Sequence, residues 1–198
     1  MSAFDRMIGY ENIKAELMRV SDVLKDHEKY KKLGVKTPRG VLLYGEPGLG
    51  KTMMAECVIE ESGRKSFVLR KDQSDGEFIK TIKEIFDKAK AEAPSIILFD
   101  DMDKYANEDY QHKDAEEYVA IQSGIDSVKD SVVFVIATVN NEDDLPDSLL
   151  RPGRFDIRIE MELPEINDVE KIIEYYLDKK NSVDSVDCEE IATLGVPQ

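Results

Sequence analysis

Two patterns of apolar residues alternate along this chain. One is a short continuous apolar run, which is typical of a strand buried on both faces of a sheet. Val41 to Tyr44, Ile96 to Phe99 and Val132 to Val139 are runs of this kind. Ser66 to Leu69 is a shorter run, and Ile157 to Met161 alternates enough to be an edge strand. The pattern therefore predicts a sheet built from these segments.

The second pattern is an apolar stripe at helical spacing, which predicts amphipathic helices between the strands. The first helix is expected from Glu11 to Lys31, before the breakers Gly34 and Pro38. Further helices are expected at 51–61, 77–91, 115–125, 169–179 and 188–194. Because strands and helices alternate, we expect an α/β fold with a parallel sheet sandwiched between helices.

A glycine-rich loop joins the first strand to the next helix. It reads Gly45-Glu46-Pro47-Gly48-Leu49-Gly50-Lys51-Thr52 and matches the phosphate-binding pattern G-x-x-x-x-G-K-[ST]. Backbone N–H groups of such a loop and of the helix N-terminus face a polyphosphate. Lys51 is expected to reach the β- and γ-phosphates, and the Thr52 hydroxyl to ligate Mg²⁺. The loop and the adjoining Met53 therefore predict a nucleoside triphosphate site, with an ordinary glycine-rich turn as the alternative.

Two acids and an amide follow two of the buried strands. Asp100 and Asp101 come directly after Phe99, and Asn140 comes after Val139. A carboxylate at the position of Asp100 can hold Mg²⁺ opposite Thr52. Asp101 is placed to polarise an attacking water, and Asn140 to hold that water or the γ-phosphate. Taken alone, the acids also fit a solvated strand end, and Asn140 also fits a turn.

Two arginines flank Pro-Gly in the polar loop that follows. Alone, Arg151 and Arg154 are surface charges. In a nucleotide hydrolase, arginines distant from their own phosphate loop indicate delivery in trans to a neighbour's site. That role requires an oligomer.

Composition narrows the class of protein. The formal net charge of −15 argues against a duplex nucleic-acid surface. No apolar run approaches the 18 or so residues of a membrane span, and the N-terminus lacks the apolar stretch of a secretory signal. Cys57 and Cys188 are too few for a disulfide framework, so a cytoplasmic location is expected.

The run from Thr138 to Asp156, TVNNEDDLPDSLLRPGRFD, resembles the second region of homology of AAA ATPases. The N-terminal part is similar too, in Phe4-Asp5, Ile8-Gly9 and the stretch from Pro38 to Tyr44. The closest likeness is to the ATPase module of membrane-bound AAA zinc metalloproteases and related unfoldases. It covers about residues 4–164.

The resemblance implies an ATP site with ATP or ADP and Mg²⁺ as ligands, and adenine near Ile8 and Gly9. By this resemblance, Asp100 is the Walker B carboxylate that lies on the Mg²⁺ side of the site, and Asp101 is the acid that acts in hydrolysis. Asn140 corresponds to the first sensor residue of the family. Arg151 and Arg154 become the trans-acting arginines. It also implies hexameric rings that remodel or unfold proteins. The expected domains are the α/β domain, residues 1–166, and the start of a helical lid, residues 167–198. Without the rest of the lid we expect a monomer in dilute solution.

Two departures from the family pattern bear on activity. The family usually has Glu where this chain has Asp101, so slow hydrolysis is expected. The segment from Arg70 to Phe78 lacks the aromatic-aliphatic-glycine motif with which the family contacts its protein substrate. Phe78 is expected to be helix core rather than a substrate contact. An ATP-driven protein remodeller is therefore the first hypothesis. The alternative is a nucleotide-dependent switch or adaptor with little turnover. A GTPase is disfavoured because the chain has no Asn-Lys-x-Asp string.

Overall fold

A parallel sheet forms the centre of the molecule. The computed structural model describes residues 2–71, 76–105 and 116–179. Within them the strands are β1 (Gly40–Tyr44), β2 (Lys65–Leu69), β3 (Ser95–Phe99), β4 (Val133–Val139) and β5 (Ile157–Glu160). Their order across the sheet is β2-β3-β4-β1-β5, and each pair is parallel. The predicted α/β sandwich is confirmed, with β5 at an edge.

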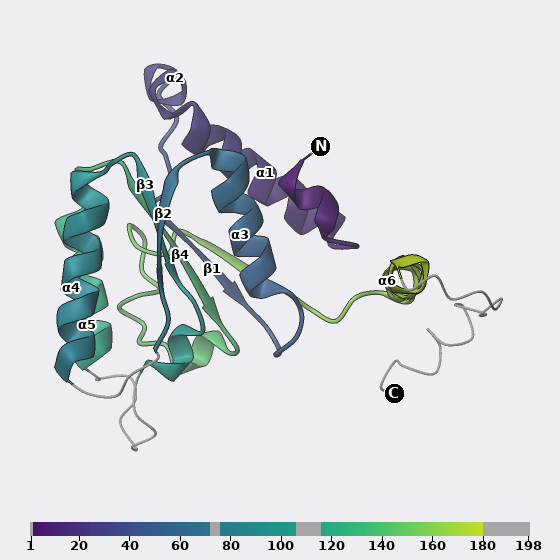
Figure 1. Ribbon diagram of the computed structural model, residues 1–198. Helices are drawn as coiled ribbons and strands as arrows, with labels where there is room; N and C mark the ends of the chain where they lie inside the picture. Colours follow the sequence, from purple (N-terminus) through teal and green to yellow (C-terminus); the bar gives the residue numbers. More distant parts are fainter. Residues whose placement is uncertain (1, 72–75, 106–115, 180–198) are drawn as a thin grey trace.

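Helices cover both faces of this sheet (Figure 1). One face carries α1 (Glu11–Lys25) and α3 (Lys51–Ser62), and the other carries α4 (Gly76–Ala91) and α5 (Glu116–Ser127). Side chains of β3 alternate between the two sides, with Ile96 in the α1 and α3 core and Ile97 in the α4 and α5 core. Each central strand is thus buried on both faces, which explains its unbroken apolar sequence.

The predicted helix from Glu11 to Lys31 is wrong in one respect, because it is two helices. α1 ends at Lys25, and α2 (His27–Lys32) follows after Asp26, whose backbone has φ −109° and ψ 36°. No side chain of α2 is buried. The apolar stripe ends with Leu24, so no core contact keeps the second helix in line with the first.

The last described helix, α6 (Ile166–Lys179), begins three residues before the predicted start at 169. Figure 1 shows it at the end of the chain segment that leaves β5, separate from the helices that cover the sheet. It occupies the place expected for the start of the lid. The domain division at residues 166 and 167 stays a prediction, and the helix predicted at 188–194 lies outside the described residues.

A close contact between α4 and α5 gives a test of this packing. A Cβ added at Gly124 would lie 2.1 Å from Cε2 of the buried Phe86 ring. Gly124→Ala is therefore expected to destabilise the protein by about 1–3 kcal/mol, although alanine normally stabilises a helix. Urea denaturation measures this effect. Ser123→Ala is the control, because Ser123 is exposed in the same helix. An equally stable Gly124→Ala protein would contradict the packing.

Candidate active site

The phosphate-binding loop lies where β1 ends, at the carboxyl edge of the sheet. Lys51, the first residue of α3, is almost fully buried and folds back over this loop. Its Nζ donates to the carbonyls of Gly45 at 2.7 Å and Glu46 at 2.8 Å, and to Asn140 Oδ1 at 3.1 Å. Burial lowers the pKa of this ammonium, while the charges of Asp101 and Asp103 oppose the shift. A cation is thus held at the start of a helix, where an anion is favoured.

Gly45 is required by the shape of the same loop. Its φ is +141°, and an added Cβ would lie 2.2 Å from the carbonyl oxygen of Met161. The loop therefore passes against the chain that leaves β5, and only glycine fits there.

Asp100 is bound from two other elements. Its Oδ1 accepts from Thr52 Oγ1 at 2.7 Å and from Thr138 Oγ1 at 2.8 Å. The register of the sheet pairs Phe99 with Ala137, which brings Thr138 beside Asp100. The structure brings together Thr52 and Asp100, the two residues predicted to hold Mg²⁺, and both supply the oxygen ligands that Mg²⁺ prefers. These residues therefore fit a hydrated magnesium ion.

Asp101 has an unusual backbone and a paired side chain. Its φ is 53° and its ψ 50°, in the left-handed region that Asp adopts more readily than most residues. Its N–H donates to Thr138 Oγ1 at 2.8 Å, and its Oδ2 accepts from Lys104 Nζ at 2.6 Å. Donating this hydrogen bond to Asp101 raises the pKa of Lys104. The carboxylate predicted to polarise water is thus paired with a lysine.

Asn140 joins Lys51 to a third acid. Its Nδ2 donates to Asp103 Oδ2 at 2.7 Å, while its Oδ1 accepts from Lys51. The other oxygen of Asp103, Oδ1, is buried with no hydrogen-bond partner among the described residues. Asp103 fixes which way the Asn140 amide points, and its free oxygen leaves an acceptor inside the site.

The two loop arginines differ in their surroundings. The side chain of Arg154 is 14% exposed; it pairs with Asp126 of α5 at 2.9 Å and also donates to the Ser148 carbonyl. Arg151 is exposed. Arg154 is therefore engaged inside its own subunit, whereas Arg151 faces solvent.

The segment proposed for adenine lies beside α6. Gly9 has φ +77°, and a Cβ on it would lie 2.6 Å from Asp168 Oδ2. The next residue, Tyr10, lines a cavity of about 430 Å³ together with Glu160, Glu162 and Asp168. These carboxylates repel phosphate, so the cavity suits an uncharged base better than the charged end of a nucleotide.

Comparison with known proteins decides the family. The sequence profile of the "ATPase family associated with various cellular activities (AAA)" matches residues 41–163, which is more than half of the chain. This chain belongs to the AAA family of ATPases. The predicted resemblance and the prediction of an ATP-hydrolysing enzyme are thereby confirmed.

Individual AAA relatives agree with this assignment. The chain is 35% identical over 187 residues to an ATP-dependent zinc metalloprotease YME1 homolog of Caenorhabditis elegans, covering 89% of the chain and 26% of that protein. It is 34% identical over 199 residues to an ATP-dependent zinc metalloprotease FtsH of Ureaplasma parvum, covering 96% of the chain and 27% of that protein. The chain thus spans about a quarter of the length of these relatives.

The structure also bears on the segment from Arg70 to Phe78, which separates this AAA chain from the family pattern. Phe78 is 4% exposed and its ring packs edge-on against Tyr105 at 5.0 Å, so the prediction that it is helix core is confirmed. Residues 72–75 of this segment lie outside the described residues.

None of the helices in the described ranges is both long and apolar enough to cross a membrane.

Sequence reasoning missed several residues of the site. From the sequence, Thr138 belongs to a buried strand and begins the run that resembles the second region of homology, but it has no predicted role in the site, and Asp103 has no predicted role at all. Arg70 begins the segment that departs from the family pattern and has no predicted role in the site, yet its side chain reaches Asp100. For Asp103 a signal existed, because a third acid stands two residues after the acidic pair.

Proposed function

We propose that this chain is the ATP-hydrolysing module of a protein remodeller that works as a homo-oligomeric ring. The observation that carries the proposal is the hydrogen bond between Thr52 and Asp100, in an AAA domain whose Arg151 faces solvent. Thr52 and Asp100 would hold Mg²⁺ with ATP or ADP, and the metal would neutralise phosphate charge. A hexamer and a protein substrate are part of the proposal.

The remaining residues have separate roles in this proposal. Lys51 exchanges its loop carbonyls for the β- and γ-phosphates when nucleotide binds. Asp101 accepts the proton of the attacking water, and Asn140, oriented by Asp103, holds that water in line. Ile8 and Gly9 border the place of the adenine. Arg151 reaches a neighbouring site, while Arg154 supports the loop that carries Arg151.

A second function, the nucleotide-dependent switch with little turnover, is favoured by one observation. The carboxylate of Asp101 is 2.6 Å from the Lys104 ammonium. Lys104 thus occupies an oxygen of the carboxylate that would take the proton of the attacking water, so the chain would bind Mg-ATP and release phosphate slowly.

Sedimentation velocity and steady-state ATPase assays separate these functions. For the remodeller we expect larger species with a non-hydrolysable ATP analogue, and a specific activity that rises with protein concentration. An unfolded protein substrate should raise it further. Assembly with almost no phosphate release would support the switch. A monomer under all conditions, with a concentration-independent rate, would contradict the ring.

A further inference from the structure

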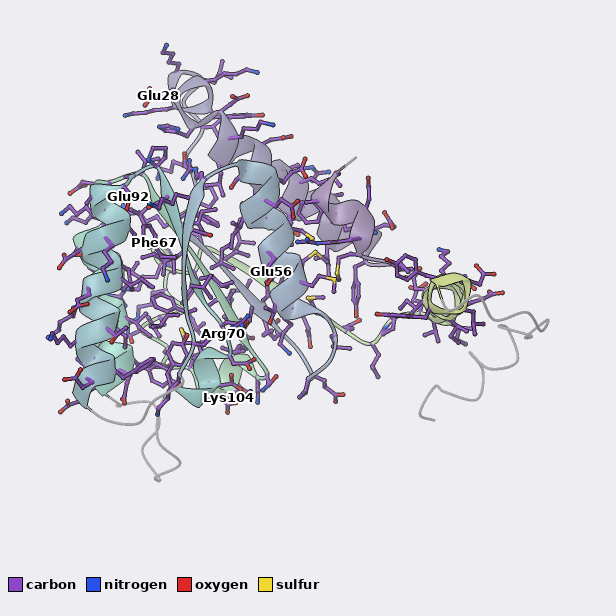
Figure 2. The ribbon with its side chains drawn as sticks, viewed as in Figure 1. Glu28, Glu56, Phe67, Arg70, Glu92 and Lys104 are labelled. Carbon is purple, nitrogen blue, oxygen red and sulfur yellow. The ribbon has the colours of Figure 1, made fainter. Side chains whose placement is uncertain are left out.

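A cation already occupies one side of the Asp100 carboxylate. Arg70 follows directly after β2, and its Nε donates to Asp100 Oδ2 at 2.8 Å. The Asp100 side chain is 6% exposed, but that of Arg70 is 60% exposed. Figure 2 shows Arg70 and Lys104 at the same end of the sheet, opposite to Glu92. The guanidinium therefore reaches a buried acid from the solvent side.

The two oxygens of Asp100 have different partners. Oδ1 accepts from the hydroxyls of Thr52 and Thr138, which are fixed by α3 and β4. Oδ2 accepts from Arg70. Because Oδ1 already accepts two hydrogen bonds, a hydrated magnesium ion beside Thr52 would be held through Oδ2. The metal and the guanidinium would then compete for the same atom.

The backbone next to Arg70 is firmly placed. The carbonyl of Leu69 accepts from the Asp100 N–H at 3.0 Å and from the Tyr105 hydroxyl. The Arg70 side chain thus starts from a fixed point beside β3, while its exposed guanidinium can leave without disturbing the core. Because the guanidinium is largely exposed, solvent screens its side of the ion pair, and a divalent ion can displace it.

We propose that Arg70 competes with Mg²⁺ for Asp100 Oδ2 and thereby sets the metal concentration that nucleotide binding requires. This inference rests on the proposed function, in which Asp100 is the metal-side carboxylate. Without metal, the guanidinium neutralises Asp100. With metal, Arg70 is released to solvent. Arg70 is a positioning and specificity residue here, because it acts through Asp100.

The alternative role is a direct contact with the γ-phosphate of the same subunit. Arginine suits phosphate well, since its planar group offers several donors. The two roles differ in their dependence on the nucleotide. Competition at Asp100 affects Mg-ADP and Mg-ATP equally, whereas a γ-phosphate contact affects ATP alone.

The test measures binding rather than turnover. Fluorescent N-methylanthraniloyl derivatives of ADP and of a non-hydrolysable ATP analogue are held at fixed concentration while free Mg²⁺ is titrated. For Arg70→Gln we expect half-saturation at about three- to tenfold less Mg²⁺ with both nucleotides. Arg70→Lys should lie near wild type, because it keeps the charge. Arg158→Gln is the matched control, since Arg158 forms an exposed pair with Glu142 instead of Asp100.

Each outcome of this titration either supports or rejects competition between Arg70 and Mg²⁺ for Asp100. An Arg70→Gln midpoint equal to or above that of wild type overturns it, as does a shift with the ATP analogue alone. If Mg²⁺ does not change nucleotide binding in wild type or any variant, the proposed role of Asp100 fails as well. A normal Mg²⁺ response with an unchanged Arg70→Gln midpoint leaves the proposed function standing and rejects only the competition.

Discussion

Arg151→Ala should lower ATP turnover by about 10³-fold at protein concentrations that support assembly, with little change in ATP affinity. Arginines delivered in trans to phosphoryl-transfer sites contribute on this scale or more, because they stabilise charge that develops in the transition state. Arg151 is exposed and lies in the polar loop between β4 and β5. Turnover is measured as phosphate release, and affinity by titration with a fluorescent nucleotide.

Arg154→Ala separates a catalytic effect from a structural one. Arg154 is largely buried and pairs with Asp126, so its removal should lower thermal stability as well as activity. Arg151→Ala should leave the melting temperature unchanged. If the two variants lose stability equally, Arg151 has a structural role as well, and the trans assignment loses its basis.

Mixing two variant subunits tests whether Arg151 acts in the nucleotide site of a neighbouring subunit or in its own. Lys51→Ala disables the nucleotide site of its own subunit but keeps Arg151 for a neighbour. Arg151→Ala keeps its own nucleotide site but offers nothing to the neighbour. A mixture of the two inactive variants should therefore regain a fraction of wild-type turnover. A mixture as inactive as its parts would show that Arg151 acts within one subunit, or that no ring forms.

Asp101→Glu is expected to raise turnover by up to about 10²-fold. The aspartate carboxylate sits about 1.5 Å further back than that of glutamate, and a misplacement of that size has an effect of this order. The structure adds a second reason, because Lys104 holds the Asp101 carboxylate at 2.6 Å. A glutamate would carry its carboxylate beyond the position in which Lys104 holds that of Asp101.

The control for this prediction is Asp101→Asn, which keeps the size of the side chain and removes the base. It should release phosphate more slowly than wild type and bind nucleotide equally well. Steady-state phosphate release for the three proteins provides the comparison. If the Asp101→Glu variant releases phosphate no faster than wild type, the length of the Asp101 side chain does not limit hydrolysis.

The strands and the phosphate loop were predictable because their signals are local. Continuous apolar runs located β1, β3 and β4 within a residue or two, and the spacing of Gly45, Gly50 and Lys51 identified the loop. The break at Asp26 had no local signal, since neither Gly nor Pro stands there. It follows from the absence of core contacts along α2, which is a property of the folded chain.

The contacts around Asp100 were not predictable in full because they depend on strand register. Thr138 reaches Asp100 because Phe99 pairs with Ala137 in the sheet, which places the next residue of each strand side by side. Arg70 directly follows β2, which neighbours β3 in the sheet, and nothing in the sequence around it indicates a carboxylate partner. Residue identity therefore predicted the type of site, whereas the pairing of β2, β3 and β4 determined which further side chains enter it.

The two outer strands of the sheet constrain how copies of this chain can associate. β2 and β5 are the edges, and they span only Lys65–Leu69 and Ile157–Glu160. Each carries a charged residue, Lys65 on β2 and Arg158 on β5, which engages a carboxylate of its own subunit. Short, charged edges disfavour strand-to-strand addition between molecules. In the proposed ring, a neighbouring subunit should therefore contact loops and side chains, and the association should be sensitive to salt.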